Sequence, residues 1–585
     1  MINTSIAFDL PLPWRGGRFE MKQLFPVNFL VGPNGSGKSQ FARSLRNQLG
    51  NARLLGTDRL SGMEQSGAML GIFGDPLREG MAKNHFDHFR EAGKEGLAID
   101  TIMLLEERMD LRIQVEATLS HLFNRSISLE WDSGHLVARA SLGDDGSSYR
   151  LDRDECHGIK ELLVLLTHLY NDASHYLVID EPELNLHPQY QAFFMQEVRK
   201  VAGNPADGSG KKVVFLITHS PFILDFRTID DLKAVVAFSL DHGSPRQMAA
   251  LDEKTAKKFQ SLVPRLNVHH KQLFFSDNPI FVEGILDAQL LGAVQNSRNV
   301  SVAGAGSCII DANGNEEVNR YVELCSAFGK HAHFLYDLDS LFSGNLRTCI
   351  KTDGTVQDFL AAAGLGSDFG GYCGEMDKKL TALVDRLLTI QTPHPLDSLV
   401  EYLRSLGSRT TWSAKSHGRA RVALLTALSR QREDMSSALT REEVSGIEGR
   451  LTKIVEALAA KRIYLLPGGT LERYLPAYTG SPYQLGEEAK RAAVNAEVDY
   501  LAEQRSEGDL GDRYGMLFEV IKKLPAKAQV NVDRVLKAYV SRYIHDLQAA
   551  VVAHETWDLD RLRGYMAKAQ AAAAKVFTLK EFQRQ

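Results

Sequence analysis

The chain has 585 residues, which is too long for a single hydrophobic core, and we expect about two to four domains. Hydrophobic residues make up 44% of the chain and charged residues 24%, the composition of an ordinary globular protein. The net charge of −5 excludes a histone-like coat of positive charge, but it leaves room for a local basic groove.

Cysteine usage and apolar runs bear on the compartment. The five cysteines form no CxxC pair, which argues against a thiolate zinc site and favours reduced thiols. The first residues lack the basic start and apolar core of a signal peptide, and no apolar run is long enough to cross a bilayer. We therefore expect a cytoplasmic protein without membrane contact.

The first motif along the chain is a phosphate loop, in the stretch VNFLVGPNGSGKSQFARSL. A strand predicted over 27–31 leads into a Gly-rich turn, and a helix follows the turn, which is the context that this motif requires. Backbone N–H groups of such a turn surround the phosphates of ATP, while Lys38 reaches the β- and γ-phosphates and Ser39 holds Mg²⁺. The residues expected to bind ATP here are Gly32, Asn34, Gly35, Gly37, Lys38 and Ser39.

Two further predicted strands carry the polar groups that such a site needs. HYLVIDEPELNLHP contains a strand that ends in Asp180, expected to bind Mg²⁺, and Glu181, expected to polarise the attacking water. KKVVFLITHSPFIL contains another strand, and it is followed by His219, for which we expect a γ-phosphate contact. A lone histidine at a strand end is usually structural, but this one follows a phosphate loop and an acidic pair in the expected order.

The order GPNGSGKS, IDEPELNLHP and ITHSP resembles the ABC-type ATPase heads of the group that includes the RecF, Rad50 and OLD (overcoming lysogenization defect) proteins. In that group a signature motif of one subunit closes over ATP that is bound by another. Cys156-His157-Gly158 resembles the Ser-x-Gly of that motif, so Gly158 would contact ATP, and the cysteine would cost one hydrogen bond to the γ-phosphate. Gly158 could instead be a plain helix cap. Gln65 is a weak candidate for a Mg²⁺-sensing glutamine.

A second set of acidic residues begins after residue 265. A strand over 280–282 is followed by Glu283, and Asp287 lies one helical turn further on. After a Gly-rich turn, HFLYDLDS brings Asp337 and Asp339, which leave the end of a strand on one side because strand residues alternate between faces. A lone DxD is more often an Asp-rich turn, but Glu, Gly turn and DxD after successive strands is the order of a Toprim domain. Carboxylate oxygens suit Mg²⁺ or Mn²⁺ better than zinc.

The last acidic position of the predicted Toprim domain resembles the corresponding position of OLD-family nucleases. These proteins carry Gly-x-Leu-Glu on their last Toprim strand, and Gly469-Thr470-Leu471-Glu472 aligns with it, so that Glu472 would complete a second metal position. Some family members have a lysine before this glycine, where this chain has Gly468. Lys461 and Arg473 are guesses for a replacement cation.

An α/β fold class follows from these motifs, with an ABC-type P-loop ATPase domain before a Toprim α/β domain. We expect the ATPase domain over 1–265 and the Toprim domain over 270–480. Amphipathic helices predict an insertion in the Toprim domain at about 355–458, and an Ala-rich helical C-terminal region covers 485–585.

This architecture implies an ATP-regulated, divalent-metal-dependent DNA endonuclease or nickase acting in bacterial anti-phage defence. By the resemblance it would form a homo-oligomer, a dimer or larger, and would act alone, with a helicase as in Gabija-type systems, or with a reverse transcriptase and its DNA as in retrons. One alternative is a non-cutting RecF-like DNA repair ATPase. The other is a Toprim topoisomerase or primase, which would need a reactive tyrosine, and neither Tyr474 nor any other tyrosine has a recognisable setting for that role.

A basic stretch over 402–432 contains no Asp or Glu and is a candidate DNA groove. Its basic residues are Arg404, Arg409, Lys415, Arg419, Arg421, Arg430 and Arg432. Trp412 lies among them and could stack on an unpaired base. A solvated helix face or a surface for an acidic partner explains the same pattern equally well.

Overall fold

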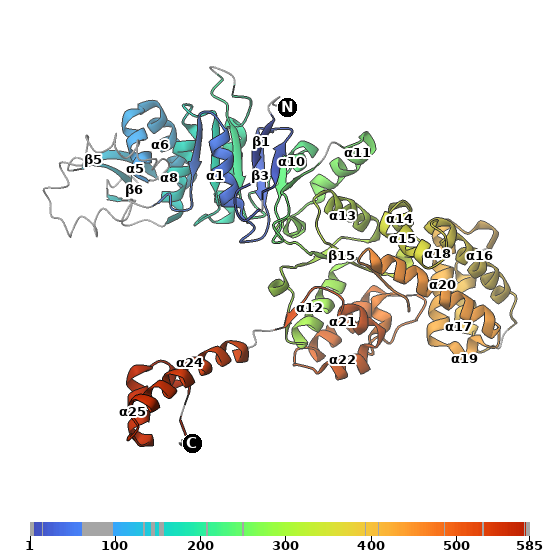
Figure 1. Cartoon of the computed structure of the whole chain (residues 1–585). Coiled ribbons are helices and arrows are strands. Elements are labelled where there is room, and N and C mark those ends of the chain that lie inside the picture. The colour runs from blue at the N-terminus through green and yellow to red at the C-terminus, as the bar shows by residue number, and fades with distance from the viewer. Residues whose placement is uncertain are drawn as a thin grey trace.

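The computed structural model describes residues 5–14, 16–60, 98–132, 135–141, 147–150, 157–205, 209–248, 251–391, 394–407, 409–484, 486–528, 532–577 and 579–580. Two separate parallel sheets dominate it, and they follow one another along the chain (Figure 1). Among these residues, no helix is long and apolar enough to cross a membrane.

The first sheet has six strands in the order β11-β10-β3-β9-β8-β4. Every neighbouring pair is parallel except the edge pair β10 and β11. All five residues are buried in both β3 and β9, because helices cover both faces of a parallel sheet. The strands are β3 (Val27–Val31), β4 (Ala52–Leu55), β8 (Tyr176–Asp180), β9 (Val213–Ile217), β10 (Val235–Ala237) and β11 (Arg246–Gln247).

Helices and small sheets surround this first sheet. On one face α1 (Lys38–Gln48) packs beneath the hairpin of β1 (Ile6–Asp9) and β2 (Arg18–Met21). On the other, α8 (His157–Tyr170) is buried over nearly its whole length. The remaining elements are α5 (Ala98–Glu107), α6 (Met109–Phe123), β5 (Ser126–Asp132), β6 (His135–Ser141), β7 (Ser148–Arg150), α9 (Pro188–Val201) and α10 (Ile229–Lys233).

The second sheet has four parallel strands in the order β14-β12-β15-β16. It is reached through α11 (Glu253–Leu262), η2 (Val263–Arg265) and η3 (His270–Phe274). Its strands are β12 (Ile280–Val282), β14 (Ile309–Asp311), β15 (His333–Asp337) and β16 (Ile463–Leu466). The helices between its first strands are α12 (Ile285–Ser297), η4 (Ala303–Ala305) and α13 (Asn315–Ala327), and β13 (Val300–Ser301) pairs with β17 (Lys527–Ala528).

A group of helices lies between β15 and β16, and its buried side chains, among them Leu380, Leu424 and Ile454, belong to an apolar core that is continuous with that of the sheets. Within this group, helix α16 contacts both α18 and α20 directly. The elements are η5 (Leu338–Leu341), α14 (Leu346–Ile350), α15 (Gly354–Ala362), α16 (Phe369–Leu388), α17 (Asp397–Ser405), η6 (Arg409–Thr411), α18 (Ala414–Arg430), α19 (Arg432–Met435) and α20 (Arg441–Ala460).

After β16 the chain is helical. The first helices pack against the second sheet through Val494, Tyr514 and Phe518. They are η7 (Leu471–Tyr474), α21 (Glu487–Tyr500), α22 (Glu507–Tyr514) and α23 (Met516–Ile521). In Figure 1, α24 (Val532–Ala553) and α25 (Leu559–Ala569) lie apart from the rest, followed by η8 (Ala573–Lys575). The expected α/β fold class with a helical C-terminal region is thus confirmed.

Candidate active site

The phosphate loop lies between β3 and α1, and its glycines are required by its shape. Gly32, Gly35 and Gly37 all have positive φ, 155°, 80° and 90°. A Cβ on Gly32 would lie 2.6 Å from the carbonyl oxygen of Phe238, and one on Gly37 would lie 2.6 Å from the Trp14 ring. Any side chain at either position would therefore push the loop away from its neighbours. Asn34 is exposed at the tip of the turn.

Lys38 folds its ammonium group back into the loop. Its Nζ donates to the carbonyl oxygens of Gly32, at 3.0 Å, and Pro33, at 2.8 Å. Burial lowers the pKa of Lys38 to about 8, although Asp180 and Glu181 nearby favour the charged form. The charge is therefore held where the loop's own N–H groups would surround a phosphate.

Asp180 ends β8 beside the first turn of α1. Burial raises the pKa of Asp180, and a hydrogen bond from Ser39 opposes the rise. Its Oδ1 is buried and has no hydrogen-bond partner among the described residues. A hydroxyl next to a carboxylate with one unsatisfied oxygen fits the Mg²⁺ position expected for Ser39 and Asp180.

Glu181 and His219 face each other across the ends of β8 and β9. Glu181 Oε1 and His219 Nε2 are 3.9 Å apart, and both side chains are partly exposed. Burial lowers the pKa of His219 to about 4, and the charge of Lys38 acts in the same direction. At neutral pH the ring is therefore uncharged and can share a single proton with a phosphate or a water.

Glu183 and Arg59 are two supporting residues that the motifs did not reveal. Glu183 accepts hydrogen bonds from the Thr218 hydroxyl, at 2.9 Å, and from the His219 N–H, at 2.6 Å, and so fixes the loop after β9. Arg59 is fully buried and donates to the carbonyl oxygens of Asp180, at 2.7 Å, and Glu181, at 2.8 Å.

Arg59 also connects the acidic pair to α8. Its Nε lies 2.6 Å from Glu161 Oε2, on the helix whose first turn contains the buried Gly158. A change at the start of α8 can therefore reach Asp180 and Glu181 through one ion pair. Cys156 and Gln65 lie outside the described residues.

The second site lies at the carboxyl ends of β12, β15 and β16, the edge where parallel sheets carry their ligands. Glu283, Asp337 and Asp339 each place a carboxylate oxygen within 4.8 Å of the other two. Glu283 Oε1 accepts from the Asp337 N–H, at 3.0 Å, and from the Ser340 hydroxyl, at 2.6 Å. Three carboxylates this close can supply oxygen ligands to one divalent cation.

Asp287 and Glu472 form the adjoining part of the cluster. Asp287 Oδ2 accepts from the N–H of Gly284, at 2.9 Å, in the first turn of α12. Glu472 lies in η7, and its buried Oε2 has no hydrogen-bond partner among the described residues. The Leu471 N–H, next to Glu472, donates to Asp337 Oδ1 at 2.8 Å, which joins the two parts.

The acids raise one another's pKa values. Burial, and then the charge of Asp339, raises the pKa of Glu283 to about 8. Burial, and then the charge of Glu472, raises the pKa of Asp287 to about 7. Burial is also the main reason that the pKa values of Asp337 and Asp339 are raised. Such a cluster holds protons near neutral pH unless cations balance its charge.

Lys490 supplies a cation at this cluster. Its Nζ lies 3.3 Å from Glu472 Oε1, and the carboxylates of Glu472, Glu487 and Asp337 help to raise its pKa. Lys490 comes from α21, in the C-terminal region where the sequence showed no chemistry. No motif surrounds it, so only the packing of α21 against α12 reveals it.

The two guessed cations have different places: Lys461 lies away from the acids, whereas Arg473 lies beside them. Lys461 pairs with Asp353 at 2.9 Å, at the start of β16 rather than at its acidic end, and the guess that it serves the acids is wrong. Arg473 is buried beside the cluster, and its carbonyl oxygen accepts from Arg430. Its Nε and Nη1 have no hydrogen-bond partner among the described residues.

The basic stretch divides into residues with different surroundings. Arg421 pairs with Asp377 at 3.3 Å, and Arg404 donates to the Ile390 carbonyl oxygen at 2.9 Å, so both have local structural partners. Lys415 and Arg419 are exposed on α18, and Arg419 is near enough to oppose the rise in the pKa of Asp339.

Two other residues of the basic stretch are less available for contacts with DNA, because they have partners within the protein. The indole N–H of Trp412 donates to the Gly407 carbonyl oxygen at 2.9 Å, and the ring packs partly against the helical core. Arg432 pairs with Glu448 at 2.9 Å. The side chain of Arg409 lies outside the described residues.

Two family models match separate parts of the chain. Residues 153–225 match the family described as "AAA domain, putative AbiEii toxin, Type IV TA system". Residues 274–339 match "Overcoming lysogenization defect protein-like, TOPRIM domain". These matches confirm the expected order of an ATPase domain followed by a Toprim domain. No curated protein matches the chain.

Solved structures similar to this chain include two C-terminal regions of OLD proteins. The one from Burkholderia pseudomallei is 15% identical, and the match covers 39% of this chain and 100% of that one, with a TM-score of 0.13. The one from Xanthomonas campestris pv. campestris is 16% identical, over 39% and 98% of the two chains, with a TM-score of 0.12. At TM-scores this low we base no conclusion on the likeness.

Proposed function

Given that the chain joins an AAA-type ATPase domain to an OLD-like Toprim domain, we propose that it is an ATP-regulated, divalent-metal-dependent DNA endonuclease or nickase. The observation that carries the proposal is the acidic cluster, in which five carboxylates and Lys490 meet at one edge of the second sheet. A domain that only binds DNA has no need to bury mutually repelling acids, because each raises the cost of folding.

The cluster divides into two sets of ligands. Glu283, Asp337 and Asp339 would hold one Mg²⁺ or Mn²⁺ ion, and Asp287 and Glu472 would contribute to a second. Bound ions of this kind supply the positive charge that activates water and stabilises a departing oxygen. Ser340 and the Asp337 N–H keep Glu283 in place for this task.

Lys490 fits the role of stabilising the leaving group. Hydrolysis of a DNA phosphodiester joins a water oxygen to phosphorus and breaks the bond to the 3′ oxygen, which then takes a proton. An ammonium group within 3.3 Å of Glu472 can stabilise the negative charge that develops on that oxygen. We therefore assign to Lys490 the role for which the sequence offered Lys461 and Arg473.

In the ATPase domain Lys38 would bind the β- and γ-phosphates, Ser39 and Asp180 would hold Mg²⁺, and Glu181 would take a proton from the attacking water. His219 would contact the γ-phosphate as a neutral ring. Gly158, at the start of α8, would close over ATP bound by a second copy, so the active form is a homo-oligomer, a dimer or larger.

DNA would approach the acids past α18. Arg419 is exposed and near enough to Asp339 to act on its pKa, and Lys415 is exposed one helical turn before it, which suits contacts to backbone phosphates. We propose that the protein acts in the cytoplasm in anti-phage defence, alone or with a helicase or a reverse transcriptase and its DNA.

The surroundings of Tyr474, the tyrosine nearest in sequence to Glu472, argue against the topoisomerase alternative. Its hydroxyl accepts a hydrogen bond from the Gly468 N–H at 2.6 Å, and burial raises the pKa of Tyr474 to about 12. Burial thus keeps the hydroxyl protonated, which makes its oxygen a poor nucleophile for attack on DNA.

Incubation of the protein with supercoiled plasmid tests the proposal. We expect nicked and linear products in Mg²⁺ or Mn²⁺, none in a chelator, and no protein covalently attached to the DNA. Binding of plasmid without cutting in either metal would favour the RecF-like alternative. A protein–DNA adduct would favour the topoisomerase alternative.

A further inference from the structure

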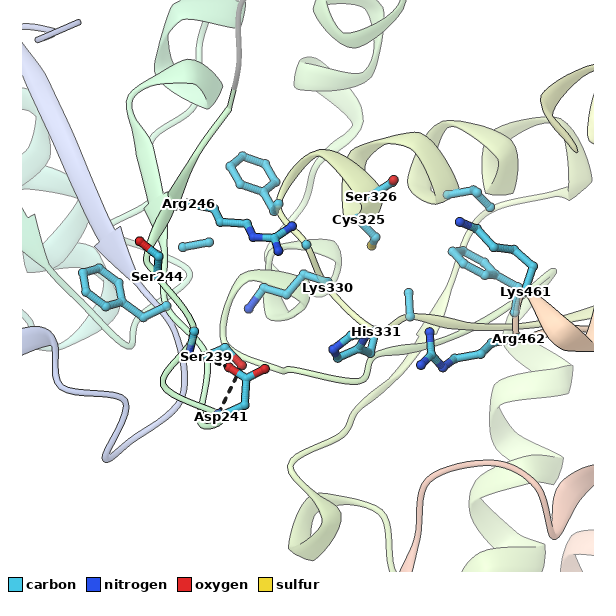
Figure 2. Close-up of a pocket in the computed structure, with 18 residues that line it drawn as sticks. Ser239, Asp241, Ser244, Arg246, Cys325, Ser326, Lys330, His331, Lys461 and Arg462 are labelled. Carbon is cyan, nitrogen blue, oxygen red and sulfur yellow. Dashed lines mark hydrogen bonds between the residues drawn. The ribbon is translucent and has the colours of Figure 1, made fainter. Parts of the chain in front are cut away.

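A cavity of about 280 Å³ lies between the two sheets, and no residue of the phosphate loop or of the acidic cluster is among those that line it. One wall is the segment from the end of β10 to the start of β11, residues 237–246. The opposite wall is formed by α13, by the segment leading into β15, and by Lys461 and Arg462 before β16 (Figure 2). The cavity therefore adjoins the amino ends of two strands whose carboxyl ends carry the acids.

Positive charge dominates the lining. The basic side chains are Arg246, Lys330, His331, Lys461 and Arg462, and Asp241 is the only carboxylate among the lining residues. Burial lowers the pKa of Lys330, so the two arginines and Lys461 carry most of the charge. Figure 2 shows the guanidinium groups of Arg246 and Arg462 extending inward from opposite walls, with His331 between them.

Local acids balance only part of this charge. Hydrogen bonds from Gly243 and Ser239, and then the nearby His331 and Arg246, lower the pKa of Asp241. Asp277 lies 4.0 Å from Lys330, and Asp353 lies 2.9 Å from Lys461. Asp241 accepts a hydrogen bond from the Gly243 N–H in its own turn, at 2.9 Å. Within the described part of the chain, the guanidinium groups of Arg246 and Arg462 make no hydrogen bond or ion pair, so two strong donors remain available to an anion.

Apolar side chains complete the cavity. Phe238, Phe328 and Phe334 line it together with the charged groups. Small-ligand sites typically combine an apolar lining with a few convergent polar groups, and their volumes begin at about 300 Å³. A cavity at that lower limit accommodates a compact ligand better than the backbone of a DNA duplex.

We propose that this cavity binds a small phosphorylated ligand, such as a nucleotide or a sugar phosphate, through Arg246, His331 and Arg462. Arginine guanidinium groups bind phosphate oxygens in pairs, and the apolar part of the lining adjoins the rest of the ligand. The site is separate from the phosphate loop and from the acidic cluster.

The first wall is tied directly to the phosphate loop. Phe238 N–H donates to the Val31 carbonyl oxygen at 2.8 Å, just before Gly32. The Leu240 N–H donates to Asp277 Oδ2 at 2.9 Å, and Asp277 faces Lys330 on the second wall. From His331 the chain runs straight into β15 and so to Asp337.

A ligand that contacts both walls would therefore favour one placement of the ATPase domain relative to the Toprim domain. We infer that it regulates how ATP turnover and DNA cleavage are coupled, an inference that rests on the proposed function. The binding itself does not rest on it, because binding can be measured without cleavage.

Binding is tested by isothermal titration calorimetry with pyrophosphate, in a Lys38→Ala background that weakens the phosphate loop. We expect one pyrophosphate per chain, and at least about a tenfold loss of affinity in Arg246→Gln/Arg462→Gln, because two charge-assisted contacts are removed. Arg246→Lys/Arg462→Lys keeps the charge and should lose less. Arg441→Gln, at the far end of α20 from Lys461, should bind as the background does.

Three results would overturn the proposal. One is the absence of pyrophosphate binding at millimolar concentrations, and another is equal affinity in the double glutamine variant. The third is displacement of pyrophosphate by a short DNA duplex, with loss of duplex affinity in Arg246→Gln/Arg462→Gln, which would make the cavity part of a DNA path. Since plasmid cutting is not measured, failure here is distinct from failure of the nuclease proposal.

Discussion

At the scale of single residues, Lys490 allows a sharp test of the chemistry at the acidic cluster. Lys490→Gln keeps most of the side chain's volume but removes the charge beside Glu472. We expect plasmid nicking to slow by about 100-fold, the usual cost of losing one group that stabilises a developing oxyanion. Lys490→Arg should retain part of the activity. Lys523→Gln, an exposed lysine after α23, is the control, and equal rates for it and Lys490→Gln would exclude this role.

The raised pKa values of the acids give a dependence on pH. Glu283 has a pKa of about 8 and Asp287 one of about 7 in the fold, both above the ordinary values of 4.5 and 3.8. Between about pH 4 and pH 8 the folded protein therefore binds more protons than the unfolded chain, and its stability without metal falls as the pH rises through that window.

Mg²⁺ competes with these protons, so its stabilising effect should grow with pH. We expect the increase in Tm on adding Mg²⁺ to a chelator-treated sample to be larger at about pH 8.5 than at about pH 6. Thermal unfolding followed by circular dichroism measures both values. An increase that is equal at the two pH values, or larger at the lower one, would show that these acids do not bind the metal.

In the ATPase domain, Glu181→Gln separates binding from hydrolysis. The carboxylate that would take the proton from water is removed, while Asp180 and Ser39 remain to hold Mg²⁺. We expect ATP to bind with nearly unchanged affinity and to turn over at least about 100-fold more slowly. A radiolabelled ATP assay with a filter-binding control checks both quantities. Turnover at the wild-type rate would mean that Glu181 is not the general base.

Among the residues, motifs predicted the groups that stand next to glycines or at strand ends, such as Lys38, Asp180 and Asp337. They did not predict Arg59, Glu183 or Lys490. Arg59 and Lys490 are brought in from outside the motifs by packing between distant segments, and a lone Arg or Lys on a helix or loop carries no local signal. Glu183 lay within a recognised motif, but its contact to His219 depends on how β8 and β9 pair.

At the scale of elements, α18 links the helical insertion to the acids. Gly418 lets this helix approach η5 so closely that an added Cβ would lie 3.2 Å from the Phe342 carbonyl oxygen. Lys415 and Arg419 are exposed on the same helix, whereas Arg421 is paired with Asp377. The basic residues of one sequence stretch thus have different surroundings, and the face of α18 that each occupies decides whether it pairs within the insertion or is exposed.

We expect Lys415→Gln/Arg419→Gln to weaken DNA binding and to reduce the log–log salt slope by about two, because each lost phosphate contact changes it by roughly 0.9. Fluorescence anisotropy of a labelled duplex at several salt concentrations measures both. Lys254→Gln/Lys257→Gln removes the same charge from exposed positions on α11 and should leave the slope unchanged. An unaltered slope in the α18 variant would place the DNA elsewhere.

The amphipathic patterns of the insertion predicted helices, and helices occupy 369–388 and 441–460. The patterns could not predict how those helices pack, because an apolar face indicates that it is buried but not which element covers it. The contact of α18 with η5, and of α21 with α12, depends on which faces meet in three dimensions.

At the scale of the whole molecule, the two candidate active sites lie on two separate sheets, and a cavity with basic lining lies between the sheets. The order of the two α/β units followed from motif order along the chain. The residues at the junction of the two units could not be predicted in this way, because Arg246, His331 and Arg462 come from three distant segments and belong to no motif. Separate sheets also mean that a change in one centre should leave ligand binding at the other intact.

The most direct test of the metal-dependent nuclease is therefore Asp337→Asn. The asparagine oxygen can still accept from the Leu471 N–H, but the side chain no longer offers a charged ligand beside Glu283 and Asp339. Plasmid nicking in Mg²⁺ and in Mn²⁺ is compared with that of the wild-type chain and of Asp358→Asn, a matched change of an exposed acid on α15. We expect nicking to vanish in Asp337→Asn only, with ATP binding unchanged. Undiminished cutting by Asp337→Asn in either metal would contradict the account.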